Sequence, residues 1–332
     1  MKRIAILAVT ALLCVVFAFA ISAETFTNPV APGADPFVFK DKDGTYYLYP
    51  TSGDAYGYQV YSSKNLVEWT ARGYCLVKAD IPYDTYNSNE NGFWAPEVFK
   101  YGDKYYMIYT CQHRLGVAVG DSPLGPFKDD AETYLIRNVA TIDGHLFEDN
   151  GKVYLYFATE RSKNDNVKFY LNGQEIPKGN NIWGCEFDME TLKMKEDTIK
   201  LILPADAKLD YTDGTTGPKV EGPYMLKHDG KYYLTFSSGG YWTPKYAVHY
   251  ATGTSPLGEF VRDTENFVLA CDDLDYSDNK NPHLYGSGHH SFTTAPNGKD
   301  LVIVYHSHRT GFSYSAGSDN LYNPRPTCLD LA

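Results

Sequence analysis

The stretch "GADPFVFKDKDGTYYLYPTS", from Gly33 to Ser52, consists of two short apolar segments joined by an Asp-Gly pair. Asp43-Gly44 is a dipeptide that supplies the positive φ angles of a tight hairpin turn, so the stretch predicts a β-hairpin. An acid, Asp35, stands at the head of the first strand, although aspartate is a poor strand former and costly to bury unpaired. The reason for this acid must lie elsewhere in the chain.

The same hairpin pattern occurs five times. Each copy has an apolar half-strand, a polar turn containing glycine, and a second strand rich in Tyr, Leu and Val. The copies are "DPFVFKDKDGTYYLYP" (35–50), "APEVFKYGDKYYMIYT" (95–110), "DGHLFEDNGKVYLYFA" (143–158), "EGPYMLKHDGKYYLTFS" (221–237) and "HHSFTTAPNGKDLVIVYHS" (289–307). Five such units predict an all-β, five-bladed β-propeller, in which radial repetition protects the sheet edges. A β-sandwich is the alternative, but it gives no reason for the turn to repeat at a fixed distance from a marked residue.

That marked residue heads the first strand of each copy. When the copies are aligned on their turns, the position holds Asp35, Ala95, Asp143, Glu221 and His289. The first strand of every propeller blade runs beside the central axis, so these positions should form a ring at one end of the channel. Carboxyl groups crowded there cannot all behave as solvated acids, because like charges and desolvation raise at least one pKa. A protonated acid facing an ionised base is the pair that glycoside hydrolysis requires.

Composition supports an all-β protein and narrows the range of partners. The chain has 29 Tyr and 17 Phe, and frequent Gly, Pro, Asn and Asp favour strands and turns. Aromatic rings stack on sugar faces, whereas a formal net charge of −11 disfavours nucleic acid or an acidic membrane as partner. The six cysteines are scattered, without zinc spacing or an implied disulfide framework.

Residues 1–23 predict a secretory signal peptide. Lys2 and Arg3 precede an apolar run, and small residues follow at Ala18, Ala20 and Ala23. A membrane anchor is the alternative, since the run is nearly long enough to span a bilayer. We therefore expect a secreted, extracellular protein in which residues 24–332 form one catalytic propeller domain.

Together, the segments "GADPFVF", "FWAPEV", "IDGHLFEDNGKVYLYF", "VEGPYMLKHDGKYYL" and "GSGHHSF" resemble the blade signatures of glycoside hydrolase family 43. Members are five-bladed propeller enzymes that act on arabinose- and xylose-containing polysaccharides, and the similarity covers nearly the whole chain after the predicted signal. The resemblance implies an inverting glycosidase that releases α-L-arabinofuranosyl or β-D-xylosyl units from plant cell-wall polysaccharide. It implies no organic cofactor.

Roles for the three acids follow from the resemblance. Asp35 becomes the general base that activates water, Glu221 the general acid, and Asp143 the third carboxylate, which raises the pKa of the acid and orients it. For inversion, the carboxyl groups of Asp35 and Glu221 should lie roughly 6.5–9.5 Å apart, which leaves room for the water.

The resemblance also assigns His289 and Arg325. His289 matches a family histidine that often ligates a structural calcium ion, although calcium prefers oxygen ligands and a hydrogen-bonded core histidine is the alternative. Arg325 in "NPRPTCLDLA" resembles an arginine that reaches the substrate or lies against the acids; a surface arginine is the alternative. Family members usually continue beyond this segment, so either the last blade is truncated or the N-terminal strand closes it.

Aromatic residues are expected near the mouth of the pocket, where the loops that enter the first strands emerge. Phe93 and Trp94, just before the second ring position, are placed to stack on a sugar, with blade-to-blade core packing as the alternative. Tyr241 and Trp242 either flank the pocket or cap a blade.

Three rival functions stay open from sequence. An endo-arabinanase of the same family would have an open groove, and a non-catalytic glycan-binding propeller would have no use for a protonated carboxyl. A retaining fructan hydrolase would need an acid at the second ring position, where the chain has Ala95, with Glu97 two residues on.

Overall fold

The computed structural model describes residues 26–52, 56–81, 92–210, 212, 216–270, 284–309 and 325–332. The predicted signal peptide lies outside these residues. The described residues contain many strands and two single-turn 3-10 helices, η1 (Lys78–Asp80) and η2 (Glu196–Thr198). None of their helices is long and apolar enough to cross a membrane.

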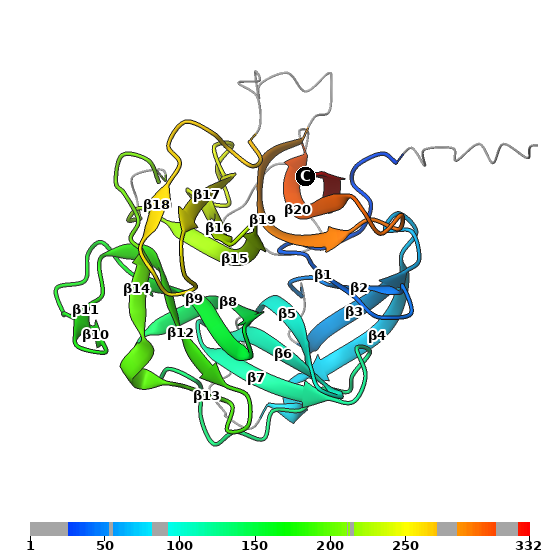
Figure 1. Cartoon of the computed structure of the whole chain (residues 1–332), viewed down its shortest axis with the longest axis horizontal. Coiled ribbons are helices and arrows are strands. Elements are labelled where there is room, and N and C mark those ends of the chain that lie inside the picture. Colours follow the sequence, from blue (N-terminus) through cyan, green and yellow to red (C-terminus); the bar gives the residue numbers. More distant parts are fainter. Residues whose placement is uncertain are drawn as a thin grey trace, which may run out of the picture.

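Five antiparallel sheets surround a common axis, which confirms the predicted five-bladed β-propeller (Figure 1). The first strands β1, β5, β8, β15 and β19 lie nearest the centre, and the later strands of each sheet lie farther out. In chain order, the sheets contain β1 (Phe37–Lys40), β2 (Tyr46–Tyr49), β3 (Gly57–Ser63) and β4 (Thr70–Val77); β5 (Phe93–Tyr101), β6 (Lys104–Cys111) and β7 (Leu115–Gly120); β8 (Ala140–Asp149), β9 (Lys152–Arg161), β12 (Gly179–Asp188), β13 (Lys193–Met194) and β14 (Lys200–Leu203); β15 (Val220–His228), β16 (Lys231–Ser238), β17 (Ala247–Gly253) and β18 (Phe260–Arg262); and β19 (Leu284–Thr294), β20 (Leu301–Arg309) and β21 (Thr327–Leu331). A separate small hairpin pairs β10 (Tyr170–Leu171) with β11 (Gln174–Glu175).

Two of the four Asp-Gly and Asn-Gly turns have the backbone angles predicted from sequence, whereas at Asp43-Gly44 and Asn297-Gly298 only the glycine has a positive φ. Asn150 and Gly151 have φ of 52° and 76°, and Asp229 and Gly230 have φ of 48° and 74°. Two successive positive φ angles match the right-handed twist of the flanking strands, so the first two strands of these blades are joined by two-residue loops.

Each interface between neighbouring blades has its own apolar core. Five clusters of buried side chains occur, and each unites residues of two adjacent sheets; one example packs Ile108 of β6 against Leu155 of β9 and Trp183 of β12. The fold is therefore stabilised mainly between blades, and every blade depends on both neighbours.

The N-terminal segment joins the last blade. Ala31 pairs antiparallel with Thr327 of β21, and the amide of Thr327 donates to the carbonyl of Ala31 at 2.9 Å. The side chain of Asn28 donates to the carbonyl of Leu329 and accepts from its amide, both at 3.0 Å. This is the closure that one of the two alternatives for the last blade predicts.

Two blade interfaces carry the same polar clasp at the turn of the first hairpin. Asp149 accepts a hydrogen bond from Tyr232 of the next blade at 2.8 Å and pairs with Lys227, whose ammonium lies 5.0 Å from the Tyr232 ring centroid. Asp41 accepts in the same way from Tyr105 at 2.8 Å and pairs with Lys100. These aspartates stand beside the turn dipeptides and tie successive blades together.

We expect Asp149→Asn to lower the free energy of unfolding by about 1–2 kcal/mol, because it weakens charge-assisted bonds at a side chain that is 10% exposed. Urea denaturation measures the change. The matched control is Asp121→Asn, which breaks the exposed pair with Lys104 and should cost less than about 0.5 kcal/mol. Equal effects of the two substitutions would show that the clasp contributes no more than a surface ion pair.

Candidate active site

Each blade has a residue in a left-handed conformation within its first strand or, in the first blade, two residues before it. The residues are Asp35 (φ 49°), Ala95 (39°), Asp143 (58°), Gly222 (55°) and His289 (45°). In the last four blades the pairing with the second strand shifts register around this residue, which marks a β-bulge. Bulges re-aim side chains, and here they mark the end of the axis at which the three acids gather. In the fourth blade the repeated position is Gly222, so the alignment that placed Glu221 in the column is wrong by one residue.

The left-handed residues are held by the preceding blade. The amides of Ala95, Asp143 and His289 donate to the hydroxyls of Thr51, Thr110 and Ser237, at 2.9, 3.1 and 2.7 Å. The amide of Asp35 has His306 Nδ1 at 3.2 Å in the same role. All four partners lie at the same place in the second strand of a hairpin, a signal that aligning the repeats could have revealed.

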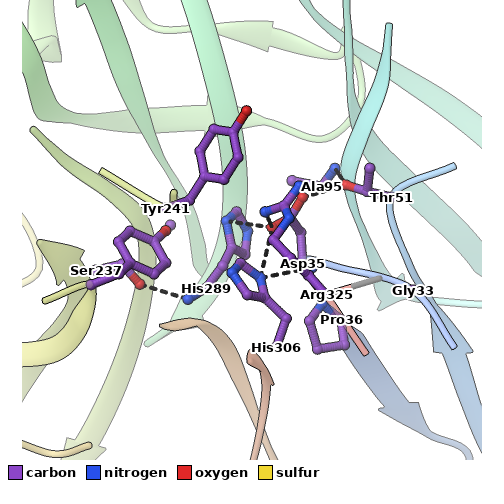
Figure 2. A network of polar contacts seen from close by, with 12 residues as sticks. Gly33, Asp35, Pro36, Thr51, Ala95, Ser237, Tyr241, His289, His306 and Arg325 are labelled. Atoms are coloured by element: carbon purple, nitrogen blue, oxygen red, sulfur yellow. Dashed lines mark hydrogen bonds and ion pairs between the residues drawn. The ribbon is translucent and has the colours of Figure 1, made fainter. Parts of the chain in front are cut away.

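Asp35 lies at the centre of a polar network (Figure 2). One carboxylate oxygen, Oδ1, accepts from Arg325 Nη1 at 3.0 Å and lies 3.5 Å from His289 Nδ1. The other oxygen, Oδ2, accepts from the hydroxyl of Thr51 at 2.5 Å. Because the Thr51 oxygen already accepts from the Ala95 amide, its own proton is directed at Asp35.

These partners keep Asp35 ionised. Burial by itself raises the pKa of Asp35, but the positive charge of Arg325, the neighbouring His289 and the contact with His306 hold that pKa well below its ordinary value. Asp35 therefore remains a carboxylate, able to accept a proton, over the whole neutral range.

His306 supports Asp35 as a neutral side chain. Burial and the nearby Arg325 lower the pKa of His306 to about 3. Its Nδ1 lies 3.2 Å from the amide nitrogen and 3.0 Å from Oδ1 of Asp35, so one tautomer accepts from the amide and the other donates to the carboxylate. In either tautomer His306 restrains Asp35.

Asp143 and Glu221 form the opposite half of the site. Asp143 Oδ2 accepts from the amide of Gly222 at 3.0 Å, which ties it to the residue after Glu221. Burial raises the pKa of Asp143, and the nearby charges of Glu221 and Asp35 raise it further. Burial also raises the pKa of Glu221, and the two carboxyls titrate as one interacting pair. This half of the site therefore retains a proton at a pH where solvated carboxyls have lost theirs.

The three acids open into one pocket of about 200 Å³. Trp94, Tyr241, Trp242 and Arg325 lie in its walls, as sequence analysis expected for Trp94 and Arg325 and left open for the other two. The guanidinium of Arg325 lies 4.4 Å from the centre of the Tyr241 ring. The pocket thus presents aromatic faces and hydrogen-bonding groups beside the acids, the combination that a sugar ring needs.

The expectation that Phe93 stacks on a sugar in the pocket is wrong. Its side chain is 0% exposed and packs edge-to-face on Tyr58, with ring centroids 5.3 Å apart, so it belongs to the core between the first two blades and does not face the pocket. Glu97 also lies away from the pocket lining, buried against His145 Nδ1 at 2.7 Å. The substitute acid that a retaining fructan hydrolase would need is therefore not at the site.

His289 lies between two acids, with Nδ1 at 3.5 Å from Asp35 and 3.9 Å from Asp143. Within the described residues, no group of three or more His, Cys, Asp or Glu side chains is arranged to hold a metal ion. The oxygens nearest His289 already accept from Arg325 and from the Gly222 amide. Calcium prefers oxygen ligands, and its binding at His289 stays a prediction.

Comparison with known proteins identifies the family. The profile of the glycosyl hydrolases family 43 matches residues 26–331. The chain belongs to glycosyl hydrolase family 43.

Relatives within this family differ in specificity. The chain is 29% identical to the β-D-galactofuranosidase xynD of Aspergillus niger, over 91% of this chain and 80% of that protein. It is 25% identical to an extracellular exo-α-(1→5)-L-arabinofuranosidase of Streptomyces chartreusis, over 85% of this chain and 82% of the relative. A solved thermostable family-43 glycoside hydrolase superposes with a TM-score of 0.71 at 31% identity, covering 92% of both chains.

Sequence reasoning missed several side chains of this family-43 site. Tyr246 donates to Glu221 Oε1 at 2.9 Å, and the side-chain amide of Asn180 donates to Oε2 at 3.0 Å. His113, Glu160 and Lys219 also line the pocket. They lie outside the repeated column and meet the acids only after the blades assemble.

We expect Arg325→Leu to raise the pKa of Asp35, because the substitution removes the cation that favours its ionised form. The acidic limb of the kcat/KM profile should therefore move to higher pH, by about one unit. Hydrolysis measured across pH checks the shift, with the exposed Arg137→Leu as control. An unmoved acidic limb would exclude Asp35 as the group that this limb reports.

Proposed function

We propose that this family-43 protein is an inverting exo-glycosidase that removes α-L-arabinofuranosyl or β-D-xylosyl units from plant cell-wall polysaccharides. Asp35 takes a proton from water, which attacks the anomeric carbon, while Glu221 protonates the departing glycosidic oxygen. The anomeric C–O bond breaks, water supplies the new hydroxyl, and the configuration inverts. Asp143 repels negative charge on Glu221 and accepts the Gly222 amide, which holds the acid protonated and in place.

The observation that carries this proposal is the contrast between the two halves of the site. Arg325, His289, His306 and Thr51 surround Asp35 and favour its ionised form, whereas burial favours the protonated form of Glu221. Titratable groups whose environments drive their pKa values apart are the signature of an assigned base and acid. A glycan-binding propeller has no need of this contrast.

The pocket supports exo action. Its small volume and the walls of Trp94, Tyr241 and Trp242 suit a single terminal sugar better than the open groove of an endo-arabinanase. The relatives supply the candidate sugars, since their names specify arabinofuranose, xylose and galactofuranose. We further propose that residues 1–23 direct export, in line with the relative described as extracellular.

The reaction is tested on three p-nitrophenyl glycosides and two polysaccharides. The glycosides are the α-L-arabinofuranoside, the β-D-xyloside and the β-D-galactofuranoside, and the polysaccharides are arabinan and wheat arabinoxylan. We expect release from at least one of the first two glycosides, and a loss of about 10²–10⁴-fold in kcat for Asp35→Asn. Glu221→Gln should lose a comparable factor on polysaccharide and less on aryl glycosides, whose leaving groups need little protonation. Retained activity in Asp35→Asn, or no cleavage of any of these substrates, would refute the assignment.

Proton NMR of the first product tests the stereochemistry. An inverting enzyme releases the sugar with the opposite anomeric configuration before mutarotation begins, because water attacks the face opposite the leaving group. Initial release of the same anomer as in the substrate would instead require a covalent intermediate and would overturn the role of Asp35 as base.

A further inference from the structure

We propose that Asn180, Lys219 and Glu160 form a cluster, here called the acid-side cluster, that orients the Glu221 carboxyl and tunes its acidity. This inference rests on the proposed role of Glu221 as general acid. The three members act on the reaction through Glu221 and are therefore positioning residues.

Asn180 is the centre of the cluster. Its side chain is buried, with the residue 2% exposed, and its amide nitrogen donates to Glu221 Oε2 at 3.0 Å. The amide oxygen accepts from the ammonium of Lys219 at 2.9 Å. A side-chain amide donates only from its nitrogen, so the cation on the oxygen fixes which end of Asn180 faces Glu221. Lys219 thereby prevents the flipped amide, which would turn an acceptor toward the carboxyl.

Backbone pairing places the cluster beside the acid. Asn180 of β12 lies directly opposite Glu160 of β9, and it also forms a parallel bridge with Lys219, just before β15. Glu160 forms an ion pair with His113 at the hairpin turn between β6 and β7. Gln112 and His113 in that turn both have positive φ, 47° and 60°, an arrangement usually left to Asn and Gly. The turn therefore accepts backbone strain while carrying the His113 ring to Glu160.

Two opposite charges thus flank one amide and act on one acid. Burial raises the pKa of Glu221, Lys219 lowers it, and Glu160 raises it again. The cation alone would favour loss of the proton before catalysis, and the anion offsets it. The other titratable groups that face Glu221 among the described residues are Asp143 of β8, Tyr246 before β17 and His289 of β19. Asp35 faces Asp143, the carboxyl beside Glu221.

The test is the alkaline limb of the kcat/KM profile, where the free enzyme loses the proton of its acid. Lys219→Met removes the cation, so the limb should move to higher pH; Glu160→Gln removes the anion, so it should move to lower pH. Each shift should be about 0.5–1.5 pH units. Lys178→Met and Glu190→Gln, which replace exposed residues, serve as controls. Shifts in the same direction, or no shift in either variant, would overturn the proposal.

Leaving-group dependence tests Asn180 separately. Asn180→Asp keeps the shape of the side chain but replaces its donor with a carboxyl oxygen and adds an acid beside Glu221, and Asn180→Ala removes the side chain without adding charge. Both should lose about 10–100-fold in kcat/KM on a phenyl glycoside and far less on the 2,4-dinitrophenyl glycoside, whose departure needs no acid. Circular dichroism and thermal melting report whether each variant is folded. If Asn180→Ala is not folded, the comparison of the two substrates is made with Asn180→Asp. An equal loss on both substrates would assign Asn180 a merely structural role.

Glu221→Gln separates this inference from the proposed function. If this variant keeps the alkaline limb and the leaving-group dependence of the wild type, the general-acid role fails and the inference fails with it. If Glu221→Gln loses the alkaline limb and depends more steeply on the leaving group than the wild type, while Lys219→Met and Glu160→Gln leave the limb in place, the acid is confirmed and only the acid-side cluster is refuted.

Discussion

The left-handed residue in or just before each first strand is the constraint on which the rest of the site depends. A regular strand would alternate its side chains between the two faces of a blade. The bulge breaks that alternation at one point and lets a polar side chain face the end of the axis. Since the backbone amides of most of these residues donate hydrogen bonds to hydroxyls of the preceding blade, the strain of a positive φ is offset where the ring is made.

Charge is then divided unequally around a symmetric frame. The Asp35 carboxylate has the Arg325 cation and His289 beside it, together with the neutral His306, whereas Asp143, Glu221 and Glu160 have Lys219 as the nearby cation. Five similar blades can thus support one asymmetric reaction, because the residues that differ between repeats lie at equivalent points of the ring. Stability depends on the apolar layers between blades, which leave this end of the axis available for chemistry.

The sequence predicted the blades and the three acids because both follow from local repetition. Asp-Gly and Asn-Gly turns mark four of the five hairpins, and Asp35 and Asp143 stand eight and seven residues before the turn dipeptides of their own hairpins. The prediction from sequence failed where a bulge changes which of two neighbouring residues faces the axis. Phe93 is buried, whereas Trp94 lines the pocket. Gly222 takes the column position that was given to Glu221. Asn180 and Glu160 could not be found, because their contact with the acid depends on how separate blades pack.

The closure of the ring also has a temporal consequence. Arg325 is two residues from Thr327, and Thr327 pairs with Ala31, four residues before Asp35. The pairing that joins the first and last blades therefore brings the guanidinium to Asp35. During synthesis on the ribosome, Asp35 is made 290 residues before its counter-ion Arg325. The Asp35 carboxylate and its counter-ion therefore meet only when the first and last blades pair.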